Sequence, residues 1–88
     1  MSLSVEFLDS FWDSFLLLDD SPETYEALLD LLAEAVMRPW MARPVEPTRL
    51  RVLLTAPDSG LPPLRLYYFF SEEGTQIAHV NTYDELEL

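Results

Sequence analysis

Apolar residues in the first part of the chain recur with a helical period. From Val5 to Leu18 they fall in pairs separated by two polar residues, and the pairs are Phe7-Leu8, Phe11-Trp12 and Phe15-Leu16. This spacing is typical of an amphipathic helix with one wide apolar face. We therefore expect a helix that is buried along one side, with a short edge strand over residues 4–7 as an alternative beginning.

A second helix is predicted to begin at Pro22 and to stop before Pro39. Ser21 is a favourable N-cap, Pro22 suits the first helical position, and the carboxylate of Glu23 interacts well with the helix dipole. Apolar residues follow at a spacing of three or four, at Tyr25, Leu28, Leu29, Leu32, Ala35 and Val36. Pro39 disfavours the helical conformation at Arg38, which ends the helix. We expect the two helices to form a hairpin.

The C-terminal half has the alternating pattern of β-strands. An extended connection over 38–48, which contains three prolines, leads into a first strand over 49–54. The residues of this strand that alternation predicts to point inward are Leu50, Val52 and Leu54. Because successive side chains of a strand point to opposite faces, Arg49 and Arg51 are expected together on the other face.

The next strand covers 64–70 and has two chemically different faces. One face consists of Leu64, Leu66, Tyr68 and Phe70, and the other of Arg65, Tyr67 and Phe69. A long hairpin loop over 58–63 precedes this strand, and the tight turn at 72–74 leads to a last strand over 75–82. An acidic tail over 83–88 follows.

These elements predict an α+β domain in which the helical hairpin packs on a small antiparallel sheet. The sheet contains a three-strand C-terminal meander and, in the alternative above, an N-terminal edge strand. A chain of 88 residues has room for a single hydrophobic core, so residues 1–88 are expected to form one domain. The hydrophobic content of 49% indicates a folded chain and not a disordered one.

Charge is distributed unevenly, with 16 acidic residues against five arginines and no lysine, which leaves a net charge of -11. Residues 1–37 hold nine acids and no base, whereas all five arginines fall between Arg38 and Arg65. A field of this sign repels nucleic acid, so contact with RNA or the ribosome would depend on the local arginine zone. The acidic runs also have an ordinary interpretation as solvated helix faces that keep a small protein in solution.

Several kinds of site lack the residues that they need. The absence of cysteine removes disulfides and thiolate metal ligands, and it suits a reducing cytoplasm. With His79 as the single histidine and with dispersed carboxylates, neither a metal nor a cofactor is expected. The N-terminus lacks the basic region of a signal peptide, and no apolar run is long enough to span a bilayer. We therefore expect a cytoplasmic protein that makes no membrane contact.

Three segments carry a resemblance to a known family. They are Arg49-Leu50-Arg51, Leu64-Arg65-Leu66-Tyr67-Tyr68 and Ile77-Ala78-His79-Val80-Asn81-Thr82-Tyr83-Asp84-Glu85-Leu86. With the order of the elements, from about Val5 to the C-terminus, they make the chain resemble the RelE/ParE toxin superfamily. The resemblance implies a toxin of a type II toxin–antitoxin pair, neutralised by a small antitoxin. Ribosome-dependent members of the family are metal-independent endoribonucleases that cut mRNA, whereas gyrase-directed members use the same fold without that chemistry.

The resemblance also implies a set of site residues. Arg49 and Arg51 fall where ribonuclease members place basic strand residues. Arg65 falls on the strand arginine of the family, where it would contact the scissile phosphate and stabilise charge that develops on it. Tyr83 or His79 would serve as the general base or acid of the cleavage.

Two functions from different classes stay open. The first is a RelE-like toxin that inhibits growth through ribosome-dependent mRNA cleavage. The second is a non-catalytic, acidic protein-interaction module on the same scaffold, which binds a basic or hydrophobic protein partner or forms a homodimer. Glu85, an acid at or near a basic position of the family, and the absence of lysine favour the second function. In that case the three arginines pair with carboxylates of the helices, and His79 is a packing residue.

Overall fold

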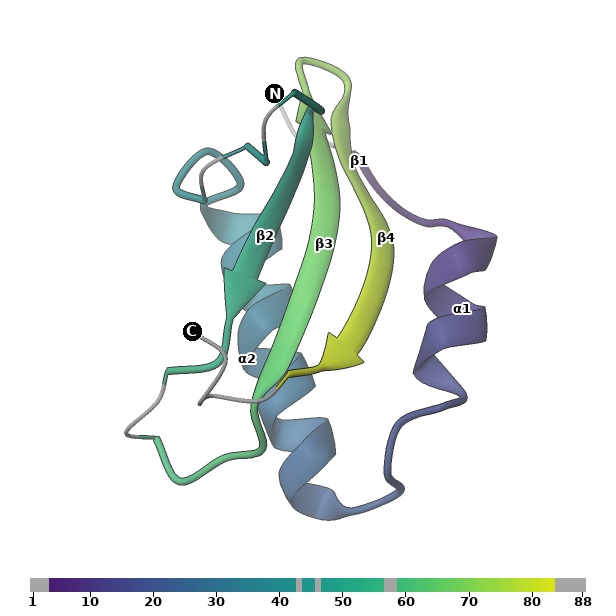
Figure 1. Cartoon of the computed structure of the whole chain (residues 1–88). Coiled ribbons are helices and arrows are strands. Elements are labelled where there is room, and N and C mark those ends of the chain that lie inside the picture. The colour runs from purple at the N-terminus through teal and green to yellow at the C-terminus, as the bar shows by residue number, and fades with distance from the viewer. Residues whose placement is uncertain (1–3, 43, 46, 57–58, 84–88) are drawn as a thin grey trace.

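The computed structural model describes residues 4–42, 44–45, 47–56 and 59–83. In chain order the elements are β1 (Ser4–Phe7), α1 (Asp9–Phe15), α2 (Pro22–Met37), β2 (Leu50–Leu54), β3 (Leu64–Ser71) and β4 (Gly74–Thr82). Figure 1 shows the strands side by side in one sheet, with α2 behind one face and α1 beside β4. The expected α+β fold is confirmed, with two N-terminal helices packed on a sheet that contains the C-terminal meander.

The sheet has the strand order β1-β4-β3-β2 and is mixed. The pairs β2–β3 and β3–β4 are antiparallel, as expected for a meander. The N-terminal edge strand is present as well, but it runs parallel to β4, with Ser4 opposite Gly74 and Phe7 opposite Ile77. Neighbouring parallel strands need a crossover connection, and the two helices with the rest of the meander supply one here.

The second helix has the predicted bounds and the predicted cap. The backbone N–H of Thr24 donates to the Oγ atom of Ser21 at 3.2 Å, and Pro22 opens the helix. The helix ends at Met37, one residue before Arg38, which forms an ion pair with Glu34 one turn earlier. These contacts satisfy or stabilise groups at both helix ends.

The first helix is shorter than the apolar pattern indicates, because residues 4–7 form the edge strand and only Asp9–Phe15 are helical. It lies along the edge of β4, whereas α2 covers the face of β3 and β2 (Figure 1). The helices meet near their connection, where the ring centroids of Phe15 and Tyr25 are 6.1 Å apart. The expected hairpin is therefore open, with each helix packed on a different part of the sheet.

The hydrophobic core lies between α2 and one face of the sheet, which we call the helical face. Fully buried side chains on β3 and β4 pack there against the inner side of α2, and the main contributors are Leu64, Leu66, Tyr68, Ile77, Val80, Ala27, Leu28, Leu31 and Ala35. The predicted inward face of β3 is confirmed. The opposite side of the sheet, which we call the open face, is not covered by a helix in the described part of the chain.

A β-bulge in β4 decides which of its side chains reach the core. Tyr67 pairs with His79, but the next residue, Tyr68, pairs with Ile77, so Ala78 is an extra residue in β4. Ile77 and Val80 are three residues apart, and regular alternation would place them on opposite faces. The bulge reverses the alternation once, and both are buried, with exposed fractions of 0% and 1%.

The predicted faces of β2 are wrong. Arg51 pairs with Tyr68 and Leu53 pairs with Leu66, so Arg51 and Leu53 lie on the helical face of the sheet. The residues predicted to point inward, Leu50, Val52 and Leu54, lie on the open face. The cause is that Leu53 interrupts the alternation and supplies an apolar residue to either face, so pairing with β3 decides the register.

Some residues used in the sequence predictions lie outside the described ranges. These are the acidic tail after Tyr83, which includes Glu85, and Arg43 and Asp58 in the two long connections. Within the described ranges, neither helix is long and apolar enough to cross a membrane.

Candidate functional site

The structure places Arg51 on the helical face, where it holds a loop. Its guanidinium donates to the carbonyl oxygen of Ala42 at 2.5 Å and, more weakly, to that of Trp40 at 3.4 Å. The same group lies 5.8 Å from the ring centroid of Phe70. Because its donors and its cationic face are used inside the fold, Arg51 acts as a structural clamp for the chain between α2 and β2.

Arg65 lies on the opposite side of the sheet. It stands between Leu54 of β2 and Asn81 of β4 on the open face, and its guanidinium lies 5.5 Å from the ring centroid of Tyr83. Arg49 is exposed in the bend before β2. The sheet therefore separates Arg51 from Arg65, and the three arginines do not form one phosphate-binding cluster.

The two candidate proton-transfer residues have different surroundings. His79 is half-buried on the open face, with its ring 5.6 Å from that of Tyr67 in an edge-on arrangement. Tyr83 is 7% exposed, and its hydroxyl donates to the carbonyl oxygen of Thr55 at 3.1 Å. A tyrosine in this position holds the end of β4 onto the chain after β2, whereas His79 stays accessible to a ligand.

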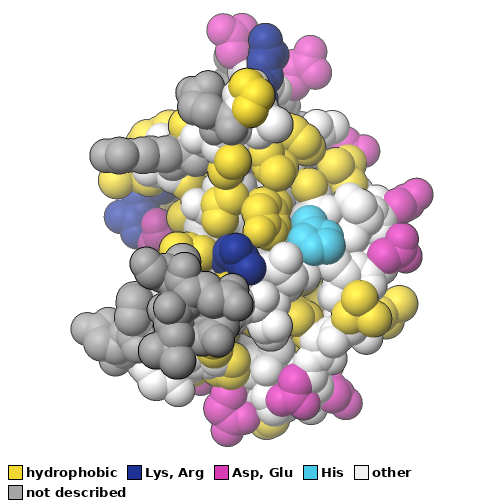
Figure 2. Space-filling model, in the orientation of Figure 1, with side chains coloured by type: hydrophobic (Ala, Val, Ile, Leu, Met, Phe, Trp, Pro, Cys, Tyr) yellow, Lys and Arg dark blue, Asp and Glu magenta, His cyan; other side chains and the backbone are white. Residues whose placement is uncertain are grey.

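The open face contains an apolar hollow of about 490 Å³. Its walls come from β2, β3, β4 and the start of α1, and the lining residues are Leu8, Ser10, Leu50, Tyr67, Phe69, Ala78, His79 and Asn81. Figure 2 looks onto this face and shows hydrophobic side chains gathered over the middle of the sheet. We call this the open-face hollow.

Asn81 lines the open-face hollow, and Arg65 lies beside the hollow on β3. Nε of Arg65 and Oδ1 of Asn81 are buried atoms without a hydrogen-bond partner among the described residues. The two residues face each other across β3 and β4. In the described part of the chain, Arg65 also forms no ion pair with a carboxylate. Buried polar groups usually have partners, so these two atoms are exceptions within the described residues. Because both atoms are buried, a ligand that lies in the hollow would contact other atoms of these side chains.

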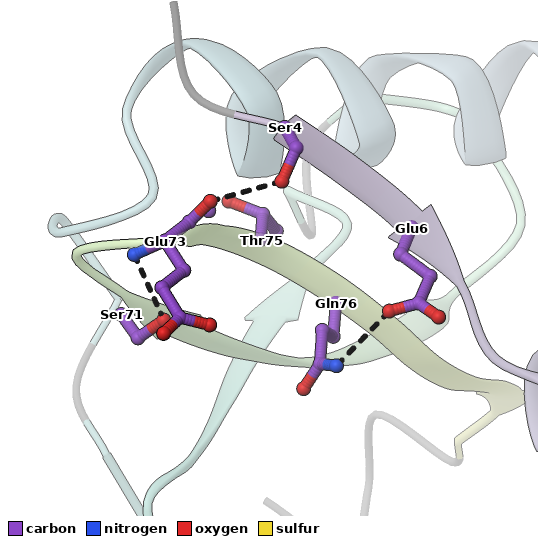
Figure 3. Close-up of a pocket in the computed structure, with 7 residues that line it drawn as sticks. Ser4, Glu6, Ser71, Glu73, Thr75 and Gln76 are labelled. Carbon is purple, nitrogen blue, oxygen red and sulfur yellow. Dashed lines mark hydrogen bonds between the residues drawn. The ribbon is translucent and has the colours of Figure 1, made fainter.

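A second, polar pocket at the β3–β4 turn is structural. Figure 3 shows that the Ser4 hydroxyl reaches the carbonyl oxygen of Glu73, at 2.9 Å, and that the amide of Gln76 donates to Glu6, at 3.1 Å. These bonds fasten β1 onto β4 at the end of the hairpin. The pocket is small, about 130 Å³, and its two carboxylates stand without a third metal ligand in the described ranges.

Two tyrosines have perturbed acidity. Burial raises the pKa of Tyr68, whose hydroxyl donates to the carbonyl oxygen of Pro39 at 2.7 Å, and the positive charge of Arg51 partly opposes that rise. The hydrogen bond to Asp20 raises the pKa of Tyr25, which is exposed at the start of α2. Neither residue lines the open-face hollow, so the perturbed groups are not candidates for its chemistry.

Sequence reasoning placed Arg65, Tyr67 and Phe69 on one face but missed Leu50 and the facing of His79. Alternation predicts Leu50 in the core, and nothing in the sequence of β2 favours the other register, which the structure has. The face of His79 depends on the bulge at Ala78. A signal for the bulge is present in the sequence, because the strongly apolar residues of β4, Ile77 and Val80, are three positions apart and not two.

Comparison with known proteins assigns neither a family nor a function to this chain. Neither the models of protein families nor the curated protein sequences contain a match to this chain.

Proposed function

We propose that this protein is a non-catalytic protein-binding module that uses the open-face hollow as its binding surface. The observation that carries the proposal is that the middle of the open face presents half-buried aromatic and aliphatic side chains, among them Tyr67, Phe69 and Leu50, without a covering helix in the described residues. Surfaces of this kind mark interaction sites, because their burial against a partner removes apolar area from water.

The partner that fits this surface is a protein segment with apolar side chains. The hollow is floored by rings and aliphatic groups, and Asn81 and His79 at its rim supply polar contacts that fix orientation. Aromatic residues in the centre of an interface contribute most of the binding energy when they become fully desolvated. A small antitoxin-like protein is one partner of this description, and the cysteine-free chain suits binding in the cytoplasm.

Charge favours a protein over RNA as the ligand. The net charge is -11, and the sheet divides the arginines that would have to hold a phosphate backbone. Stacking platforms for single-stranded nucleic acid combine aromatic rings with a cationic groove. The open face has the rings, but among the described strand residues Arg65 is the arginine that lies on this face. Arg51 holds the loop on the helical face, and Arg38 pairs with Glu34.

A RelE-like endoribonuclease is the second candidate, and one observation favours it. Arg65 has no carboxylate partner among the described residues, and it shares the open face with His79 and the ring of Tyr67. In that arrangement Arg65 would stabilise charge on a phosphate and His79 would move a proton. The chemistry would then rest on these two residues and not on Arg49, Arg51 or Tyr83.

Photocrosslinking tests the binding module. A benzophenone amino acid replaces Phe69 on the open face and, in a matched control, Met37, which is 73% exposed at the end of α2. Irradiation of cells that contain the natural neighbouring genes is expected to give a covalent adduct of one defined mass from position 69 and none from position 37. Equal labelling from both positions, or no adduct from position 69, contradicts the proposal.

Induced expression in bacteria separates the two candidates. The intact chain is compared with an Arg65→Ala/His79→Ala variant while growth and mRNA integrity are followed together. The binding module predicts that mRNA stays intact with either chain. Cleavage of ribosome-bound mRNA by the intact chain but not by the variant establishes the ribonuclease instead.

A further inference from the structure

A second apolar surface runs over β1, α1 and α2, away from the open-face hollow. Its residues are Phe7, Trp12, Phe15, Tyr25, Leu29 and Val36, and we call it the helical strip. Three ring contacts make its first part continuous, with centroid distances of 5.4, 6.0 and 6.1 Å from Phe7 through Trp12 and Phe15 to Tyr25. Leu29 and Val36 continue it along α2, four and eleven residues after Tyr25, on one side of the helix.

Apart from Phe15, which is half-buried, the helical strip is exposed although it is made of large apolar residues. Trp12 is 49% exposed, Leu29 64% and Val36 44%. The reason lies in α2, whose apolar arc is wider than the area that the sheet covers. One side of α2 faces the sheet and is buried, and its residues are Thr24, Ala27, Leu28, Leu31 and Ala35. The α2 residues of the strip stand about a third of a turn away around the helix.

The charges around the helical strip have one sign. The three elements that form it lie within residues 1–37, which hold nine carboxylates and no basic residue. Glu23, Glu26 and Asp30 are exposed on α2, and Asp9 and Asp13 are exposed on α1. The apolar strip is therefore bordered by a negative surface that cations approach and anions do not.

We propose that the helical strip binds a cationic amphipathic helix of a partner protein. The strip extends along α2 from Tyr25 to Val36, about 16 Å or three helical turns, which matches a helix that inserts residues at a spacing of three, four and seven. Lysine or arginine on the flanks of such a helix meets the carboxylates of α1 and α2. A second copy of the chain is a poor occupant, because it brings the same negative surface to the contact.

This binding surface does not depend on the proposed function. It shares no residue with the lining of the open-face hollow, although α1 contributes to both, with Ser10 in the hollow and Trp12 in the strip. Variants of one surface can therefore be made without replacing a lining residue of the other.

Titration of the whole chain with two synthetic peptides tests the inference. The first is an amphipathic 18-residue helix of leucine and lysine, and the second has the same composition in a scrambled order that spreads leucine over all faces. Calorimetry is expected to show binding of the amphipathic peptide at least about tenfold tighter than binding of the scrambled one, the factor that corresponds to about 1.4 kcal/mol. Equal affinities would mean attraction by charge alone and would overturn the proposal.

Paired variants locate the contact. Leu29→Ser/Val36→Ser changes the strip, and Met37→Ser changes a more exposed apolar residue outside it. The double variant is expected to weaken the amphipathic peptide at least about tenfold, and Met37→Ser is expected to leave the affinity unchanged. Circular dichroism confirms that each variant is folded. Equal effects of the two variants, or concentration-dependent dimerisation that the double variant abolishes, would assign the strip to another role.

Discussion

The backbone N–H of Val80 donates a hydrogen bond to the Oγ atom of Ser14, 3.0 Å away, so a helix side chain replaces a neighbouring strand at the edge of β4. One turn earlier, the Ser10 hydroxyl donates to the carbonyl oxygen of Ala78 at 2.5 Å. Four residues of helix rise about 6.0 Å and two residues of strand about 6.6 Å, so serines at i and i+4 match alternate positions of β4. The helix thereby protects an edge that β1 leaves uncovered.

Ser14→Ala is expected to reduce the free energy of unfolding by about 1–3 kcal/mol, because the buried N–H of Val80 loses its acceptor. Urea unfolding followed by circular dichroism measures the change. Asp13→Ala, at the neighbouring exposed position of α1, is the control and should change stability by less than about 0.5 kcal/mol. Similar values for the two variants would show that Ser14 does not stabilise the edge.

Gly74→Ala is expected to detach or strain β1. A Cβ atom at this position would lie 2.2 Å from the carbonyl oxygen of Ser4, and the φ angle of 143° disfavours any L-residue. Gly60→Ala is the comparison, because Gly60 also has a positive φ, 77°, but nothing lies within 4 Å of its Cβ position. Gly60→Ala should cost about 1 kcal/mol and Gly74→Ala clearly more, with faster amide exchange in β1.

Tyr68→Phe is expected to make stability less sensitive to alkaline pH. Burial raises the pKa of Tyr68 above its ordinary 10.0, so the unfolded chain releases this proton at a lower pH than the folded chain does. The stabilisation is complete below pH 10 and falls as the pH rises through the folded pKa.

Chemical unfolding at several values from about pH 8 to about pH 11 measures this dependence. At neutral pH the variant should be less stable by about 1–3 kcal/mol, because the carbonyl of Pro39 loses its donor. At alkaline pH the difference from the intact chain should shrink. Curves that stay parallel over the whole range would contradict the role given to Tyr68.

Arg51→Ala is expected to affect stability, whereas Arg65→Ala is expected to affect crosslinking. Arg51→Ala removes the bonds to Ala42 and Trp40 and should lower stability by about 1–3 kcal/mol without changing crosslinking from position 69. Arg65→Ala changes the open face beside the hollow, opposite the lining residue Asn81, and should reduce that crosslinking. Thermal unfolding and adduct yield, measured for both variants, check the pair. An equal loss of stability in the two variants would show that both arginines have a structural role.

Residues adjacent in sequence were sufficient to predict the ends of α2 and the two faces of β3. Ser21, Pro22 and Pro39 act through their own backbone geometry and hydrogen bonds to near neighbours, so the ends of α2 follow from residues adjacent in sequence. β3 alternates without interruption, and the sides of Arg65 and Tyr67 were therefore predictable. The overall α+β order of the elements rests on the same two periodicities.

Contacts between segments distant in sequence decided the register of β2, the side of His79 and the length of α1. Two registers of β2 bury apolar residues, and pairing with Leu66 and Tyr68 selects the one that brings Leu50 to the open face. The bulge at Ala78 sets the side of His79, and the edge of β4 shortens α1 by drawing residues 4–7 into the sheet. A strand's period specifies that its faces differ but not which face is covered, and that depends on which segments pack against it.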